Sequence, residues 1–232
     1  MQLRNGYLGA SGERVVGVDV GEFVAGEPVE DFFASSARFE RCTFRGLRVE
    51  EFSAGEGTPA SEYVDCVFDG LRADLLNGRA RFVRCSFRDI HIGRVIGRSM
   101  SMVDCVWTGV LEEAEFRGRD VGGDGEENEF TGNDFSGADL QQVSFRFGID
   151  LSAQRLPDGP EYVYVSDLRA ALTAAREAAN AYPPQQLVNA EELISLWARD
   201  LEFGQRQLLL RRSLWGTDDA GRDLLDLFGT MR

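Results

Sequence analysis

The 232-residue chain contains no lysine, and histidine occurs once, at His91. Its 25 basic residues are therefore all arginine, against 39 aspartates and glutamates, and the net charge is −14. This acid excess excludes simple binding to the phosphate backbone of nucleic acids, which requires a basic surface. It permits the opposite, a protein that itself resembles a polyanion.

Long apolar runs are also missing. The N-terminal stretch MQLRNGYLGASGERVVGV lacks the apolar core of a secretion signal, and no segment reaches the roughly 20 apolar residues of a membrane span. We therefore expect a cytoplasmic protein that does not bind membranes. A chain of this length can form one large or two modest domains with a substantial core.

Four similar fragments contain all four cysteines, Cys42, Cys66, Cys85 and Cys105, at spacings of 24, 19 and 20 residues. Cut every five residues, the first fragment reads ARFER, CTFRG, LRVEE, with apolar or small residues at the first and third positions. Two inward positions in five fit neither a helix nor a flat strand. The pattern predicts a chain that turns a corner every five residues and closes a square coil of about 20 residues.

The same cut yields the further units CVFDG, CSFRD, NDFSG and ADLQQ, and the register extends from roughly Val15 to Leu151. This pattern resembles the pentapeptide-repeat family, whose motif places a small residue two positions before a central leucine or phenylalanine. The resemblance implies a mainly β fold: a right-handed quadrilateral β-helix over residues 1–158, followed by a C-terminal α-helical segment. Loop insertions are expected near residues 53–60 and 118–128.

In this register, large apolar side chains form two internal columns. One column is expected to contain Phe44, Phe68, Phe87, Trp107 and Phe135, and the other Phe39, Tyr63, Phe82, Met102 and Phe130. Neighbours in a column would be about 4.8 Å apart, the spacing between strands. The cysteines would form a third column, continued by Asn133, that is too extended for all four to share one zinc ion. We predict buried free thiols that act as small hydrophobes rather than a disulfide framework.

Outward positions alternate in charge from coil to coil. One series is Arg41, Asp65, Arg84 and Asp104, and two shorter series are Arg38, Glu62, Arg81 and Arg45, Asp69, Arg88. Opposite charges on neighbouring coils are expected to pair, each exposed pair contributing at most about 1 kcal/mol.

Catalytic motifs are missing. No G-x-S-x-G, H-E-x-x-H or Walker-type motif occurs, and His91 falls at an outward position. We predict no enzymatic activity, no cofactor and no metal centre. The stretch GRDVGGDGEENE fails the EF-hand spacing, and weak calcium binding by Asp120, Asp124, Glu126 and Glu127 is left open.

Residues 159–232 predict helices. One helix is expected to begin at Ser166 as its N-cap and to end at Pro183, and a second to begin at Asn189, with Glu192 completing a capping box. We interpret this segment as an α-helical capping and dimerisation domain, which makes a homodimer a candidate assembly. The candidate helical interface comprises Leu193, Trp197, Leu201, Leu208 and Leu209. The alternative is that these apolar residues pack on one another.

The acid excess is concentrated in residues 101–158, which have 13 acidic and 4 basic side chains, whereas residues 37–100 have 9 acidic and 11 basic. We predict a partner-binding surface at this acidic end and its loop. The candidate residues are Glu112, Glu113, Glu115, Asp120, Asp124, Glu126, Glu127, Glu129, Asp134 and Asp139.

The resemblance implies DNA mimicry, because quinolone-resistance members of the family are acidic proteins that bind DNA gyrase. The first functional hypothesis is therefore a binder or protector of DNA gyrase or topoisomerase IV that does not itself bind nucleic acid. The alternative is a rigid protein–protein interaction scaffold with a helical partner-binding domain, unrelated to topoisomerases.

Overall fold

A computed structural model of the chain describes residues 1–119 and 126–231, and the chain divides into two compact units. Unit 1 comprises Met1–Val143 and Ala153–Pro157, and unit 2 comprises Ser144–Ser152 and Asp158–Arg232.

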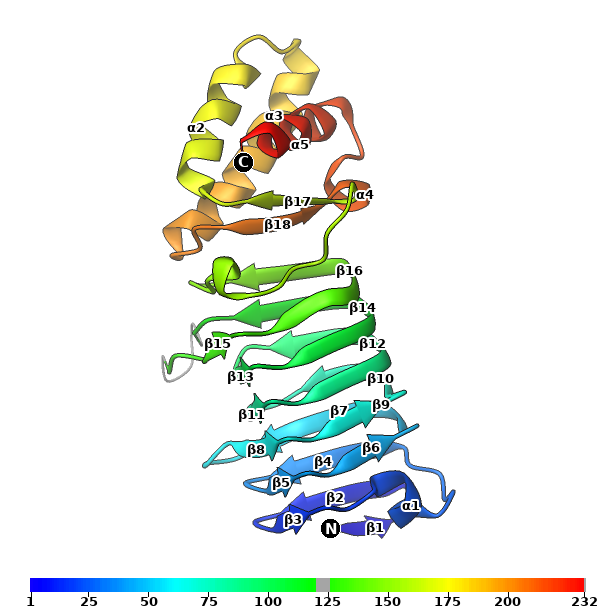
Figure 1. Ribbon diagram of the computed structural model, residues 1–232. Coiled ribbons are helices and arrows are strands. Elements are labelled where there is room, and N and C mark those ends of the chain that lie inside the picture. The colour runs from blue at the N-terminus through cyan, green and yellow to red at the C-terminus, as the bar shows by residue number, and fades with distance from the viewer. Residues whose placement is uncertain (120–125, 232) are drawn as a thin grey trace. The chain divides into compact units, whose positions relative to one another are not determined.

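Two sheets form unit 1 (Figure 1). The larger has ten strands. Eight of them are neighbours in the order β1 (Gln2–Arg4), β2 (Tyr7–Ser11), β4 (Asp31–Ser35), β7 (Arg48–Glu56), β10 (Arg72–Asn77), β12 (Ser86–Gly97), β14 (Val106–Arg117) and β16 (Asp134–Arg146). The other two are β6 (Thr43–Arg45), which pairs with β9 (Val67–Asp69), and β9, which also pairs with β12. The smaller has six strands, in the order β15 (Phe130–Thr131), β13 (Met100–Val103), β11 (Ala80–Val83), β8 (Ser61–Val64), β5 (Arg38–Glu40) and β3 (Arg14–Val16). A short helix, α1 (Val20–Val24), contacts β6.

The expected fold class, a mainly β right-handed quadrilateral β-helix, is wrong. The fold is mixed α/β with 46% strand, and it combines a curled, half-barrel sheet of mixed parallel and antiparallel strands with parallel pairing in the smaller sheet. The antiparallel component of the larger sheet is β1, which pairs with β2 through Leu3 opposite Leu8.

Strand length explains this correction. Strands β12, β14 and β16 contain 12, 12 and 13 residues, so they continue through positions at which the five-residue cut placed corners. Pairing between β12 and β14 runs on to Gly97 opposite Phe116, with one register shift between Phe87 and Ile90. Residues 53–56, expected in a loop insertion, are likewise the end of β7.

The predicted internal columns are confirmed. Phe39, Tyr63 and Phe82 occupy equivalent positions on successive parallel strands of the smaller sheet. In the larger sheet, the Phe68 ring stacks on Phe44 and on Phe87, with centroid distances of 4.7 and 4.5 Å and interplanar angles of 11° and 5°. These rings are fully or almost fully buried, so the two columns form the core of unit 1.

The chain bends from the smaller to the larger sheet immediately before each cysteine. Arg41, Asp65, Arg84 and Asp104 occupy these bends with φ angles of 51°, 55°, 51° and 55°. This left-handed conformation costs a non-glycine residue roughly 1–2 kcal/mol. At the equivalent place the chain has Gly132, with a φ of 68°. The bends therefore place the charged series at corners, where strand-to-strand contacts offset the strain.

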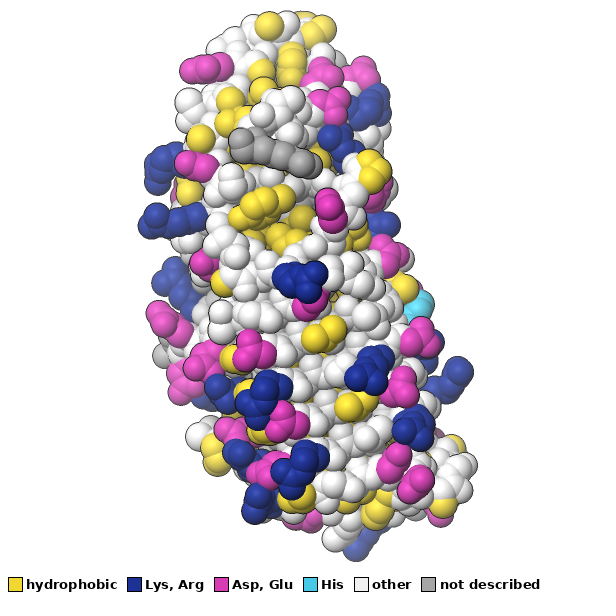
Figure 2. All heavy atoms as spheres, viewed as in Figure 1, with side chains coloured by type: hydrophobic (Ala, Val, Ile, Leu, Met, Phe, Trp, Pro, Cys, Tyr) yellow, Lys and Arg dark blue, Asp and Glu magenta, His cyan; other side chains and the backbone are white. Residues whose placement is uncertain are grey.

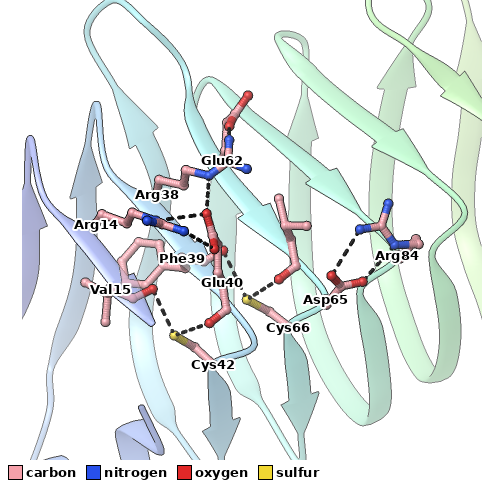
Figure 3. Close-up of polar contacts among 11 residues, drawn as sticks. Arg14, Val15, Arg38, Phe39, Glu40, Cys42, Glu62, Asp65, Cys66 and Arg84 are labelled. Atoms are coloured by element: carbon pink, nitrogen blue, oxygen red, sulfur yellow. Dashed lines mark hydrogen bonds and ion pairs between the residues drawn. The ribbon is translucent and has the colours of Figure 1, made fainter. Parts of the chain in front are cut away.

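The cysteines are buried and free, as predicted. Each thiol donates to carbonyl oxygens of the sheet; the Cys66 Sγ lies 3.5 Å from the oxygens of Phe39 and of Val64 (Figure 3). Contact with the Cys66 thiol, together with burial, raises the pKa of the Cys42 thiol well above its ordinary value. The pKa of the Cys105 thiol is instead lowered, by its hydrogen bond with the Cys85 thiol. All four cysteines are buried and pack as small side chains of the core.

Asn133 continues the cysteine column and is fully buried. Its side-chain oxygen accepts from the Cys105 amide at 3.1 Å, and its Nδ2 donates to the Met102 carbonyl at 2.9 Å and to Gln154 at 3.0 Å. An amide replaces the thiol here because it satisfies backbone groups at the last described strand of the smaller sheet.

Unit 2 has a separate core. Its elements are β17 (Tyr162–Val165) antiparallel to β18 (Leu208–Arg211), the helices α2 (Leu168–Ala179), α3 (Pro184–Glu202), α4 (Arg212–Trp215) and α5 (Asp219–Thr230), and the first two residues of a 3₁₀ turn, η1 (Leu151–Ala153). The N-cap of α2 is Asp167 rather than Ser166, since its carboxylate accepts from the Ala170 amide at 3.0 Å. Helix α3 begins at Pro184, and Asn189 lies inside it. Proline is favoured at this position because its missing N–H would have no helical partner.

The candidate helical interface residues lie in or against this core. Trp197 and Leu208 are 1% and 6% exposed, and Leu193 and Leu201 are partly buried against the same cluster. Leu209 is intermediate in exposure on β18. The structure therefore agrees with the alternative interpretation, in which these residues pack on one another within unit 2.

Candidate functional site: an acidic ridge on the larger sheet

The predicted acidic surface is mostly paired with basic side chains. The ion pairs are Glu113 with Arg94, Glu115 with Arg117, Glu126 with Arg79, Glu129 with Arg81, and Asp134 with Arg155, and Glu112 forms a hydrogen bond with the His91 ring at 2.6 Å. Asp139 accepts from Gln141, and Glu127 forms a backbone bridge with Arg119. Asp120 and Asp124 lie outside the described residues. The structure therefore distributes these carboxylates among arginines and one histidine instead of gathering them into a field of one sign.

The alternating charges pair only in part as predicted: Arg38 with Glu62, Arg84 with Asp65 and Arg45 with Asp69 form ion pairs, whereas Arg81 pairs with Glu129. Glu40 accepts from Arg14 at 2.7 Å and from Arg38 at 2.6 Å, and Arg38 also pairs with Glu62 (Figure 3). Arg84 bonds both carboxylate oxygens of its strand neighbour Asp65, at 2.7 and 3.0 Å. Figure 2 shows the result on one face, where basic and acidic side chains lie next to one another.

The Glu40 network makes stability sensitive to acid. Hydrogen bonds from Arg14 and Arg38 hold the pKa of the Glu40 carboxyl at about 2, below its ordinary value of 4.5. Because the folded-state pKa is depressed, the stabilisation is complete above the ordinary pKa and is lost as pH falls from about 4.5 toward about 2. In Glu40→Gln we expect the urea midpoint to fall less than in the wild type across this window.

The matched control is Glu27→Gln, because Glu27 is an exposed acid outside the arginine network. Its acid profile should follow that of the wild type. A Glu40→Gln profile that is also parallel to the wild type would show that the network contributes nothing to acid sensitivity.

A different charge pattern crosses the larger sheet. Asp31 on β4 lies opposite Glu51 on β7. The Glu50 amide donates to the Glu30 carbonyl at 2.7 Å, which places these two acids side by side. Asp74 on β10 lies opposite Glu50, between the pairs Ala73–Val49 and Leu75–Glu51. We call these five residues, Glu30, Asp31, Glu50, Glu51 and Asp74, the acidic ridge.

The acidic ridge is not neutralised within the described part of the chain. Asp31 accepts from the Glu51 amide at 3.0 Å, and Glu51 accepts from the Asn77 side chain at 2.9 Å. Among residues 1–119 and 126–231, no arginine or histidine forms an ion pair with any of the five. Glu30, Glu50 and Asp74 are exposed, so the ridge keeps its charge at the surface.

Like charges on neighbouring strands oppose folding. An opposite-charge pair on adjacent strands contributes roughly 0.2–1 kcal/mol, and a like-charge pair is destabilising. The smaller sheet follows the stabilising arrangement, while the ridge places Asp31 against Glu51 and Glu50 against Asp74. The ridge is therefore an exposed arrangement that costs stability, in a unit whose smaller sheet pairs acids with arginines, and we take it as the candidate site.

Among the residues the structure describes, no group of three or more histidine, cysteine, aspartate or glutamate side chains could hold a metal. The ridge carboxylates are spread over three strands and do not converge on one point. They suit an extended basic surface.

Sequence reasoning missed the acidic ridge. Charge counts along the chain drew attention to residues 101–158, while the ridge lies partly in residues 37–100, where basic side chains outnumber acidic ones. The available signal was the repetition of an acidic doublet, Glu30-Asp31 and Glu50-Glu51, at a distance of one repeat.

No helix within the described residues is both long and apolar enough to cross a bilayer. No protein-family model matches the chain, and no curated protein matches its sequence. The resemblance to pentapeptide-repeat proteins therefore rests on the sequence pattern alone.

Proposed function

We propose that this protein is a non-enzymatic binder of a basic protein surface that otherwise binds DNA. The observation that supports the proposal is the acidic ridge, whose carboxylates oppose one another on β7, on β10 and at the start of β4, with Glu30, Glu50 and Asp74 exposed. The ridge would act as a substitute for a stretch of phosphate backbone.

The charge density of the ridge supports this proposal. Three adjacent strands span about 10 Å, since each is about 4.8 Å from the next. Duplex DNA over that length has about six charges, at one charge per roughly 1.7 Å. The five ridge carboxylates are close to this number.

DNA gyrase and topoisomerase IV are the first candidate partners. The sequence resemblance suggests them, and both enzymes have the basic DNA-binding surface that the ridge requires. The protein would act in the cytoplasm, where occupying this surface would protect the enzyme from quinolones or other topoisomerase poisons.

Binding to gyrase should compete with DNA and depend on salt. We expect immobilised gyrase to bind the purified protein at micromolar concentration and to release it when duplex DNA is added. Raising ionic strength from about 0.05 M to about 0.2 M should weaken binding roughly tenfold or more, because exposed charges are screened. Absence of binding, or binding that duplex DNA does not displace, would contradict the proposal.

The alternative function, a scaffold whose partner binds the helical unit, makes a different prediction. Helix α3 has the exposed apolar side chains Val188 and Leu196, which favour a docking role for unit 2. Under this alternative, substitutions on α3 would abolish partner binding, and substitutions in the acidic ridge would leave it unchanged.

A further inference from the structure

The two-stranded sheet of unit 2 has an outer edge along β17. The Arg212 amide donates to the Glu161 carbonyl at 2.8 Å, so these two residues form a hydrogen-bonded pair across the sheet. In an antiparallel ladder such pairs alternate with non-hydrogen-bonded ones, and Tyr164 opposite Leu209 is therefore a non-hydrogen-bonded pair. The N–H and C=O groups of Tyr164 consequently point away from β18.

This edge is not closed by the rest of the described chain. The Tyr162 amide donates to the Gly159 carbonyl at 3.2 Å, which forms a turn before the strand. Among residues 1–119 and 126–231, no turn, loop or cap hydrogen bond uses the backbone of Tyr164. Sheets normally cover or charge such an edge, because its free backbone groups can pair with another strand. The edge at Tyr164 is therefore able to accept a third strand.

A cavity of about 440 Å³ lies beside this edge. Its walls include β17 from Tyr162 to Tyr164, the preceding loop at Asp158 and Gly159, and the end of α5 at Thr230. Figure 1 shows α5 on the side of β17 that faces away from β18, and the two elements are in contact. The volume is within the roughly 300–1,000 Å³ of typical ligand pockets. A segment that pairs with β17 would therefore have room to place a side chain in the cavity.

The cavity has an excess of negative charge. Asp158 and Asp226 line it together with one basic side chain, Arg212, which pairs with Asp226 at 2.6 Å. Asp158 is exposed and accepts from the Gly159 amide at 2.8 Å, and within the described part of the chain it forms no ion pair. The last turn of α5 contains no basic residue, so the negative end of its helix dipole adds to this charge. The cavity therefore favours a basic side chain.

We propose that the outer edge of β17 and this cavity bind an extended segment of another protein that contains an arginine or lysine. The main chain of the segment pairs with the N–H and C=O groups of Tyr164. Its basic side chain enters the cavity and meets the Asp158 carboxylate. Main-chain pairing supplies the affinity, and the carboxylate supplies the preference for a basic residue.

This site is independent of the acidic ridge. The ridge belongs to unit 1, whereas the residues that line the cavity belong to unit 2. Loss of gyrase binding in a ridge variant and loss of peptide binding at β17 are therefore separate results.

Selected peptides test the site on the full chain. Random short peptides displayed on phage are selected on the immobilised protein, and synthetic copies are measured by fluorescence anisotropy. We expect the enriched peptides to share an arginine or lysine flanked by β-branched residues, with dissociation constants on the order of 10 µM. A selection that enriches no peptide, or only peptides without a basic residue, would overturn the proposal.

Variants of the edge separate main-chain from side-chain contacts. Tyr164→Pro removes an N–H that points away from β18, a position at which an edge strand tolerates proline, and should weaken peptide binding at least roughly tenfold. Tyr164→Ala keeps this N–H and should bind within about threefold of the wild type. Leu209→Pro, directly opposite on β18, is the matched control and should leave binding unchanged. Equal losses in the two proline variants would contradict a contact at the outer edge of β17.

The carboxylate is tested by Asp158→Asn. This variant should weaken the binding of basic peptides about fivefold, the effect of losing one exposed charge pair, and should remove their advantage over peptides with glutamine in place of the basic residue. An unchanged advantage would show that Asp158 does not select the basic side chain.

A scan of the peptide leaves the protein itself unchanged. Methylating one main-chain nitrogen at a time should abolish binding only at alternate positions, because alternate N–H groups of a strand face its neighbour. Hydrogen exchange followed by NMR should show the Tyr164 amide exchanging rapidly in the free protein and protected in the complex. A scan without this alternation, or a Tyr164 amide that the peptide does not protect, would overturn the proposal even if the proline variants fail to fold.

Discussion

Neutralising the acidic ridge should weaken binding to DNA gyrase by roughly a hundredfold. The variant is Glu30→Gln/Glu50→Gln/Asp74→Asn, which removes three exposed carboxylates and keeps the Asp31 and Glu51 hydrogen bonds. At about 1 kcal/mol for each lost charge contact, three contacts correspond to about two orders of magnitude in the dissociation constant. Surface plasmon resonance against immobilised gyrase measures the change.

The same variant should be at least as stable as the wild type. It removes the like-charge contact between Glu50 and Asp74 and reduces the repulsion around Glu30, each of which opposes folding. Weaker binding together with an equal or higher urea midpoint would separate a functional role of the ridge from a structural one.

A matched control removes the same number of charges elsewhere. Glu62→Gln/Asp65→Asn/Glu129→Gln acts on the smaller sheet, where these acids pair with Arg38, Arg84 and Arg81. Its net charge equals that of the ridge variant, so binding should be almost unchanged while stability falls. If the control weakens gyrase binding as much as the ridge variant, then net charge rather than the ridge determines affinity.

Phe68→Ala should destabilise unit 1 by about 3–5 kcal/mol, the cost of deleting a buried aromatic ring. Phe68 is fully buried, and its ring stacks between Phe44 and Phe87 and meets Phe52 edge-on at 5.8 Å. The stacked rings on either side leave the core little freedom to close the cavity that the substitution would create. The change is measured by urea denaturation followed by far-ultraviolet circular dichroism.

Phe23→Ala on α1 is the control with the same chemical change. Phe23 is 45% exposed, and substitutions at such surface positions usually change stability by about 0.5 kcal/mol or less. A Phe68→Ala variant no less stable than Phe23→Ala would mean that the aromatic column does not carry the stability of unit 1.

The fold class could not be read from the five-residue pattern. That pattern reports which side chains point inward, and it places Phe44, Phe68 and Phe87 correctly. It does not report whether backbone pairing is interrupted between one unit and the next. In β12 and β14 the pairing continues, and the strands merge into one curled sheet.

The helical segment shows a similar limit. The amphipathic spacing placed Trp197 on the apolar face of a helix, but this spacing does not show whether that face packs within the same chain or against a partner. In the structure Trp197 packs within unit 2, against Trp215 and Phe228 at centroid distances of 5.9 and 5.4 Å. The exposed side of α3, with Leu196 and Phe203, became visible only when the core was known.

The sequence by itself determined the register of unit 1. Its period of about 20 residues, with a cysteine and an aromatic residue at fixed positions, is sufficient to align Cys42, Cys66 and Cys85 and the rings beside them, because parallel strands repeat the same environment. Only the tertiary structure decided which acids are neutralised. The Arg81–Glu129 pair joins residues 48 positions apart, whereas Glu50 lies across from Asp74 and forms no ion pair with an arginine among the residues that the structure describes. Surface charge depends on strand neighbours that are distant in sequence, and counting charges along the chain cannot reveal them.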